Sequence, residues 1–340
     1  DAGWAYHEDN AILGSTGRFT SMIEHMGLQH RFVSEEQVAQ GKLRSLGTRV
    51  LILPHTIAMS PSVAGGIRRF AAEGGVVVAD GEPGVFDGHS RKLPKTLLSD
   101  LFNAEMNGTA AAFGKGRAVS LAPGDPGAAE RLARIFKDAG IAPVLPVTRP
   151  DGAPPEDVET YVFRDGNATI VALQRNPPAS AAAAGDAGRD LGPGSDETLV
   201  LTLPRGSFAY DVSRRKALGR TGRLELSLGP VEPVIFALSD APFPAPIVEA
   251  PRRLKAGETA MVRFGLANAS AAAFHVLHVD VVDPSGRTLG HYSGNILFAG
   301  ETVMRPLPLA LNDKAGTWTV RVEDVLSGQA ATAKLEVSER

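Results

Sequence analysis

The sequence predicts a multidomain protein in which an α/β domain with a parallel sheet is followed by two β-sandwich-type domains. The chain has 340 residues, which is enough for two or three domains with separate cores. Up to about residue 145, continuous apolar runs alternate with segments of helical periodicity, as in parallel sheets covered on both faces. Beyond that point apolar residues recur at every second position, which is typical of half-buried strands.

The composition excludes several classes of protein. Apolar residues make up 43% of the chain and the formal net charge is −3, so there is no electrostatic reason to expect nucleic acid as a partner. The absence of cysteine excludes disulfides, thiolate metal sites and a cysteine nucleophile. No apolar run approaches the roughly 20 residues of a membrane-spanning helix, so we expect no membrane span.

The first predicted domain covers residues 1–148. Its strand candidates are AILGS (11–15), HRFV (30–33), RVLILP (49–54), GGVVVAD (74–80) and GRAVSL (116–121). A helix between the first two candidates is expected to end at Gly27. Residues 34–37 have the S-x-x-Q form of a capping box, which predicts a short helix after them.

Two longer helices are predicted in the same domain from their end residues. Ser60 can cap the first, Pro61 suits its first turn and Gly74 suits its end. The second is expected between Asp125 and Gly140. Each has an apolar face at helical spacing, formed by Val63, Ile67 and Phe70 in the first helix and by Leu132, Phe136 and Ala139 in the second.

The second predicted domain covers residues 149–243 and the third covers residues 244–340. Residues 149–157 form a predicted linker, and a hairpin is expected to turn at residues 165–167. Residues 176–196 are rich in Ala, Gly and Pro, which predicts a long mobile loop. Alternation predicts the core-facing residues of three further strands: Leu224, Leu226 and Leu228; Val262, Phe264 and Leu266; and Trp318, Val320 and Val322.

The run LILPHTIAMSPSVAGGIRRFAAEGGVVVADGEPGVFDGHSRKLP, residues 51–94, resembles the trimerisation domain of β-galactosidases that carry a catalytic TIM barrel. FGKGRAVSL at 113–121 resembles a late strand of the same domain, and the resemblance extends over about residues 10–145. It implies a flavodoxin-like, class I glutamine-amidotransferase-like fold. Residues 209–238 resemble a β domain of multidomain glycoside hydrolases, and residues 312–337 resemble an immunoglobulin-like C-terminal module of secreted bacterial proteins.

The resemblance implies a function for this part of the protein. We expect a non-catalytic C-terminal region of a carbohydrate-active, glycoside hydrolase-like protein, serving assembly, domain orientation or glycan presentation. The catalytic glutamates of such β-galactosidases lie on their barrel, and this chain contains no barrel to which they could be transferred. The implied partners are carbohydrate and the rest of a larger polypeptide, with a homotrimer by resemblance only. An extracellular or periplasmic location is expected, and no cofactor.

An acidic turn follows the strand predicted to end at Asp80. In amidotransferases of the resembled fold the elbow has the form G-x-C-x-G, and residues 80–84, DGEPG, place Glu82 where the cysteine stands. A carboxylate can be a nucleophile or a general base, given a nearby base and an oxyanion site. His55, at another strand end, lies on the same predicted edge. A solvated turn is the favoured interpretation, and Asp80, Glu82 and His55 are the candidate catalytic residues.

Two alternatives therefore stay open. In the first alternative the chain is a hydrolase with its site near Glu82. In the second it is a sugar-binding or cell-surface interaction module. In the second case Tyr292, Trp4 and Tyr6 are candidates for stacking on sugar rings, whereas Trp318 is expected in a core. His278 and Asp280 share a predicted strand face, but two ligands without a third do not predict a metal site.

Overall fold

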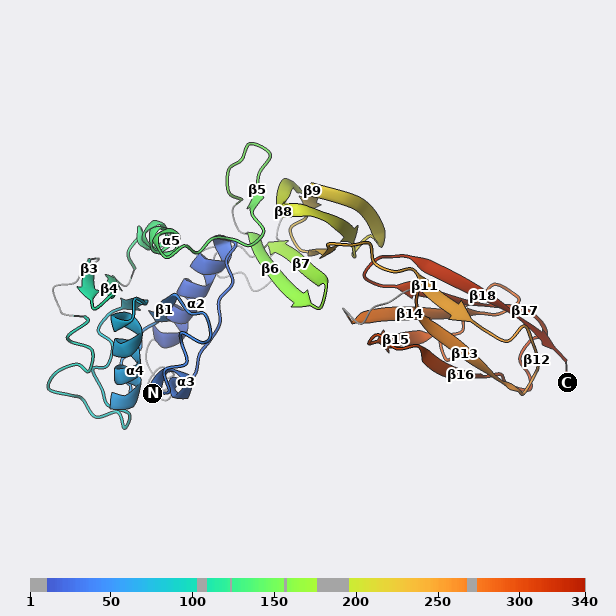
Figure 1. The fold of residues 1–340 in the computed structure, drawn as a ribbon, viewed down its shortest axis with the longest axis horizontal. Coiled ribbons are helices and arrows are strands. Elements are labelled where there is room, and N and C mark those ends of the chain that lie inside the picture. Colours follow the sequence, from blue (N-terminus) through green and yellow to red (C-terminus); the bar gives the residue numbers. More distant parts are fainter. Residues whose placement is uncertain are drawn as a thin grey trace, which may run out of the picture. The chain divides into compact units, whose positions relative to one another are not determined.

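The computed structural model describes residues 11–102, 109–122, 124–155, 158–175, 196–267 and 274–339 (Figure 1). The chain divides into two compact units, Asp1–Pro143 and Val144–Arg340. The domain boundaries predicted from the sequence remain predictions. The loop predicted at residues 176–196 lies outside the described residues, except for Asp196. Across the described ranges, no helix has both the length and the apolar character to cross a membrane.

The first unit contains a four-stranded sheet with the order β1-β2-β4-β3. β1 pairs with β2 and β2 with β4 in parallel, whereas β3 pairs with β4 in antiparallel orientation. The strands are β1 (Val50–Leu53), β2 (Val76–Asp80), β3 (Ala110–Phe113) and β4 (Gly116–Leu121). The helices are α2 (Ala11–His25), α3 (Glu35–Ala39), α4 (Pro61–Ala72) and α5 (Ala128–Asp138).

The central strand β2 is buried on both faces because helices cover both. Val77 and Ala79 belong to a core cluster that also contains apolar residues of α3 and α4. Val76 and Val78, which point the other way, belong to a second cluster with residues of α2 and α5. This double burial explains why β2 is a continuous apolar run.

The flavodoxin-like, amidotransferase-like parallel-sheet fold predicted for this unit is wrong. The described chain is mostly β, and the sheet of the first unit is small and mixed. Residues 11–15, a predicted strand, lie in α2, and residues 30–33 lie outside any helix or strand. In α2, Ser15, Phe19 and Ile23 recur every four residues and are buried. The burial of this helical face stabilises a helix more than the short apolar run at 11–15 favours a strand.

Two helices in this unit, α3 and α4, begin with the capping residues that the sequence predicted. Ser34 and Gln37 form the reciprocal capping box at the start of α3. Ser60 accepts a hydrogen bond from the Val63 N–H, and Pro61 occupies the first turn of α4. α5 lies within the predicted range of residues 125–140, and it begins after Gly127 without a side-chain cap.

α4 approaches α3 closely at one glycine. A Cβ atom on Gly66 would lie 2.1 Å from the carbonyl oxygen of Val38, whereas a Cβ on the neighbouring Gly65 would meet nothing within 4 Å. Only glycine fits at position 66, because the atom that a side chain would meet belongs to the backbone of α3 and cannot easily move.

The second unit begins with a single six-stranded sheet, in which β9 pairs with β8 beside the path β5-β8-β10-β7-β6. The sandwich predicted here is therefore wrong. The main core against this sheet is one large cluster, and a smaller buried cluster includes Ala168, Tyr210 and Ala237 of the same strands. The predicted hairpin is confirmed, since β6 and β7 pair up to Asp165 and Ala168. The strands are β5 (Val147–Thr148), β6 (Val158–Asp165), β7 (Ala168–Arg175), β8 (Glu197–Asp211), β9 (Lys216–Leu228) and β10 (Val234–Ser239).

The rest of the second unit consists of two sheets that share one core. One has the order β11-β13-β16 and the other β12-β18-β17-β14-β15. Trp318 is fully buried between them, and its indole N–H donates to the Lys314 carbonyl at 2.9 Å. The strands are β11 (Pro246–Glu249), β12 (Arg253–Lys255), β13 (Thr259–Leu266), β14 (His275–Val282), β15 (Gly294–Phe298), β16 (Val303–Pro308), β17 (Gly316–Asp324) and β18 (Ala330–Ser338).

The turn after β14 is organised by one carboxylate. Asp283 accepts hydrogen bonds from the Ser285 hydroxyl at 2.6 Å and from the Arg287 N–H at 3.1 Å. These bonds, the Ser285 hydroxyl first, lower the pKa of Asp283 to about 2.

The two neighbouring glycines of α4 give opposite predictions. Gly66→Ala should lower the free energy of unfolding by about 1–3 kcal/mol, because the new methyl group collides with the Val38 carbonyl. Gly65→Ala, the matched control, should raise it by about 0.5–1 kcal/mol, because alanine favours the helix. Urea unfolding of both variants measures this difference. Equal effects would contradict the close approach of α3 and α4.

The low pKa of Asp283 predicts a contribution to stability that depends on pH. In the unfolded chain an aspartate has a pKa of about 3.9, so below that value the unfolded state binds the proton more readily. The contribution is therefore present above about pH 4 and is lost as the pH falls towards about 2. Asp283→Asn should flatten the dependence of the melting temperature on pH in this window. An unchanged slope would contradict the assignment.

Candidate functional site

The residues that sequence analysis singled out lie at the carboxyl ends of β1 and β2. Asp80 is the last residue of β2, and His55 follows β1 by two positions. Because these strands are parallel neighbours, their ends meet at the same edge of the sheet. The structure therefore brings Asp80 and the backbone of His55 together, as the sequence predicted.

Asp80 is buried, with only 5% of its surface exposed, and both of its carboxylate oxygens are occupied. Oδ2 accepts hydrogen bonds from the Ser15 hydroxyl at 2.5 Å and from the Arg18 guanidinium at 2.6 Å. Oδ1 accepts the backbone N–H of His55 at 2.6 Å. The carboxylate thus joins α2, the end of β1 and the end of β2.

The neighbouring candidates do not complete a catalytic arrangement with Asp80. Glu82 is exposed, and it stands after Gly81, whose φ is +83°. His55 has a φ of +40°, in the left-handed region, and its backbone N–H donates to Asp80. Among the described residues, no group of three or more His, Asp or Glu side chains could hold a metal ion. The catalytic roles of Asp80, Glu82 and His55 remain predictions.

The other candidates from the sequence lie in the second unit or outside the described residues. His278 and Asp280 share the outer face of β14, with His278 Nε2 3.4 Å from an Asp280 oxygen. Tyr292 is half-buried and donates its hydroxyl to Asp313 at 2.8 Å. Burial, together with this hydrogen bond, raises the pKa of Tyr292 above the usual value of a tyrosine. Trp4 and Tyr6 lie outside the described residues.

A buried polar cluster that the sequence analysis missed lies next to β14 and β17. The His275 Nδ1 atom lies 2.8 Å from an Asp324 oxygen, and the Ser327 hydroxyl donates to the other oxygen at 2.5 Å. His275 and Asp324 are 4% and 0% exposed. A serine, a histidine and an aspartate thus meet, but the burial of the histidine keeps substrate away from it.

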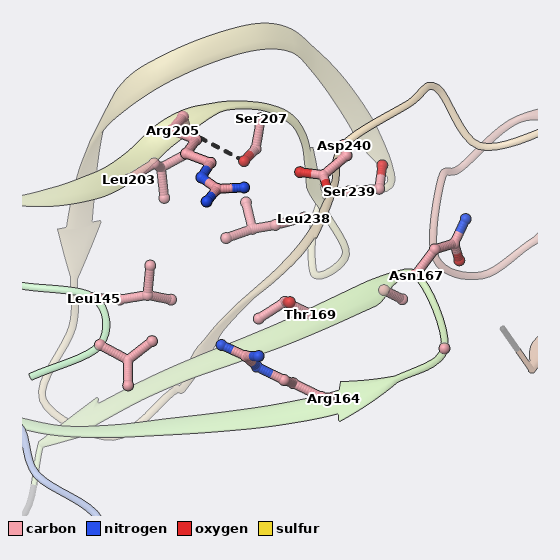
Figure 2. Close-up of a pocket in the computed structure, with 13 residues that line it drawn as sticks. Leu145, Arg164, Asn167, Thr169, Leu203, Arg205, Ser207, Leu238, Ser239 and Asp240 are labelled. Atoms are coloured by element: carbon pink, nitrogen blue, oxygen red, sulfur yellow. Dashed lines mark hydrogen bonds between the residues drawn. The ribbon is translucent and has the colours of Figure 1, made fainter. Parts of the chain in front are cut away.

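The second unit also contains an open pocket of about 460 Å³ that sequence analysis did not predict (Figure 2). Its apolar lining includes Leu145, Leu203 and Leu238, all buried members of the core of the six-stranded sheet. Polar side chains line the rest of it. They are Arg164, Asn167, Thr169, Arg205, Ser207, Ser239 and Asp240.

The pairing register of the strands brings the residues of this pocket lining together. Arg164 pairs with Thr169 across β6 and β7, and Thr169 pairs with Leu238 across β7 and β10. Directly paired residues point to the same face of a sheet, so these three side chains form a row. Arg205 and Ser207 come from β8, where the pairing with β9 shifts between Thr202 and Ser207. Pairing between strands far apart in the sequence leaves no local sequence pattern. The pocket could therefore not be predicted from the sequence.

The chain matches no protein-family model and no curated protein sequence. Among solved structures it is similar to an exo-carrageenase of family GH42 from Bacteroides ovatus, with 18% identity and a TM-score of 0.41 over 67% of this chain and 27% of that one. It is also similar to Gan42B, a GH42 β-galactosidase, with 13% identity and a TM-score of 0.49 over 70% of this chain and 37% of that one. The chain thus spans well under half of either enzyme.

The contacts of Asp80 predict that its carboxylate is structural. Asp80→Asn should lower the free energy of unfolding by about 2–3 kcal/mol, because a partly exposed Arg18 loses a buried charged partner. Asp100→Asn is the matched control, since Asp100 and its partner Arg68 are exposed by 44% and 36%. It should cost at most about 1 kcal/mol. Chemical denaturation of both variants measures the difference, and equal costs would contradict the structural role.

Proposed function

We propose that this chain is a non-catalytic accessory region of a larger carbohydrate-active protein of the glycoside hydrolase type. Its role is to assemble the protein, orient its domains or present glycan. The link to carbohydrate rests on the resemblance of residues 51–94 to the trimerisation domain of β-galactosidases. The same resemblance extends the proposal to a trimer. The predicted β domains and the absence of cysteine extend it to an extracellular or periplasmic location.

One observation supports the non-catalytic part of the proposal. The best-placed carboxylate at the sheet edge, Asp80, has both oxygens engaged by Ser15, Arg18 and the His55 N–H. A nucleophile or general base needs a free oxygen that faces substrate. In Asp80, both oxygens already accept the hydrogen bonds that join α2, the end of β1 and the end of β2.

The chain alone should therefore show no glycosidase turnover. The measurement is hydrolysis of nitrophenyl glycosides and of galactans by the purified chain, with Glu82→Gln and Glu73→Gln assayed beside it. Glu73 is the control, because it is another exposed glutamate, at the end of α4. Turnover that disappears in Glu82→Gln and survives in Glu73→Gln would contradict the proposal and favour the hydrolase alternative.

The size of the native protein gives a second, independent test. A catalytic TIM barrel adds roughly 250 residues, so an antibody against this chain should detect a band far above 35.7 kDa in the source cells. Cells and medium are blotted separately, which tests the proposed location as well. A band at the mass of this chain would contradict the larger polypeptide.

A further inference from the structure

We propose that the pocket of the six-stranded sheet binds an acidic saccharide, through a carboxylate or sulfate group held between Arg164 and Arg205. This inference goes beyond the accessory role proposed above. It concerns binding at the second unit, and it would stand even if the chain proved to be a hydrolase at the first.

The first observation is the convergence of two guanidinium groups on one pocket. Arg164 comes from β6 and Arg205 from β8, and Figure 2 shows them on opposite sides of the pocket, with Leu238 and Thr169 between them. Neither arginine forms an ion pair with an acidic side chain in the described parts of the chain. Two like charges that face a common space favour an anion between them. Arginine suits carboxylate and sulfate oxygens, because its planar fork donates two parallel hydrogen bonds.

A third guanidinium extends the positive surface. Arg220 of β9 donates to the carbonyl of Gly206, the residue between Arg205 and Ser207, at 3.2 Å. Arg220 is exposed and also lacks an acidic partner among the described residues. The positive charge therefore continues from the pocket onto β9, although the whole chain has a formal net charge of −3.

The remaining lining favours a sugar over a nucleic acid. Asn167, Thr169 and Ser207 offer amide and hydroxyl groups that can pair with sugar hydroxyls, and Asp240 can accept from them. The pocket lining contains no aromatic side chain, whereas single-stranded nucleic acids are usually held by stacking on aromatic rings. The volume of about 460 Å³ lies in the usual range for a small ligand.

Calorimetric titration of the intact chain tests the proposal. The probes are a galacturonic acid tetramer, a sulfated galactan oligosaccharide, a neutral galactan oligosaccharide of the same length and a thymidine oligonucleotide. We expect saturable binding of at least one charged saccharide, at least about tenfold tighter than the neutral one, and weaker binding in about 0.5 M salt. Preference for the first or the second probe identifies the bound group as carboxylate or sulfate.

The variants locate the site. Arg164→Gln and Arg205→Gln should each weaken binding by about tenfold, since each removes a charge-assisted pair. Asn167→Asp keeps both arginines but adds a negative charge to the pocket, and it should weaken binding as well. Arg253→Gln on β12 is the control, an exposed arginine away from the pocket lining, and it should bind like the parent. Thermal unfolding of each variant checks that it folds.

Four outcomes would overturn the proposal. They are equal affinity for the neutral and charged saccharides, no binding of either charged saccharide, an unchanged affinity in both pocket arginine variants, and tighter binding of the oligonucleotide than of any saccharide. None of these bears on turnover or on native size, so failure here is distinct from failure of the accessory role.

Discussion

The first unit depends on the buried carboxylate of Asp80. A charge in a buried position is costly unless it is paired and fully hydrogen-bonded, and this one receives three donors from two other segments. Each donor fixes a different part of the chain: α2 through Ser15 and Arg18, and the end of β1 through His55. His55, which donates its N–H to the carboxylate, also has a backbone conformation in the left-handed region.

Much of the local structure could be predicted where pattern and burial agree. The apolar run of β2 is buried on both faces, and the helix α4 begins at the serine and proline that its sequence indicated. The strand predicted at residues 11–15 was wrong because five residues are too few to distinguish a strand from a helix. A longer window would have included Phe19 and Ile23, which continue the four-residue spacing from Ser15.

The two candidate sites differ in how far their polar groups are already satisfied. At the edge of the first sheet the sequence placed Asp80 and His55 correctly, yet the fold already engages both oxygens of Asp80. In the pocket of the second unit the polar groups come from β6, β7, β8 and β10, and strand register brings them together. Arg164 and Arg205 are 41 positions apart in the numbering, so only the paired sheet makes them neighbours. Register of this kind is a property of the whole sheet and has no local sequence marker.

The dependence of α2 on its surroundings has a consequence for the order of folding. α2 contains Gly14 and Gly17, neither of which has a neighbour that would obstruct a side chain, and both lower the intrinsic helicity of the segment. A helix of this length with poor propensity is marginal in isolation, so packing of Phe19 and Ile23 must supply most of its stability. We therefore expect α2 to form after β1 and β2 have paired, and to open before them. Amide hydrogen exchange that is slower in α2 than in β2 would contradict this sequence of events.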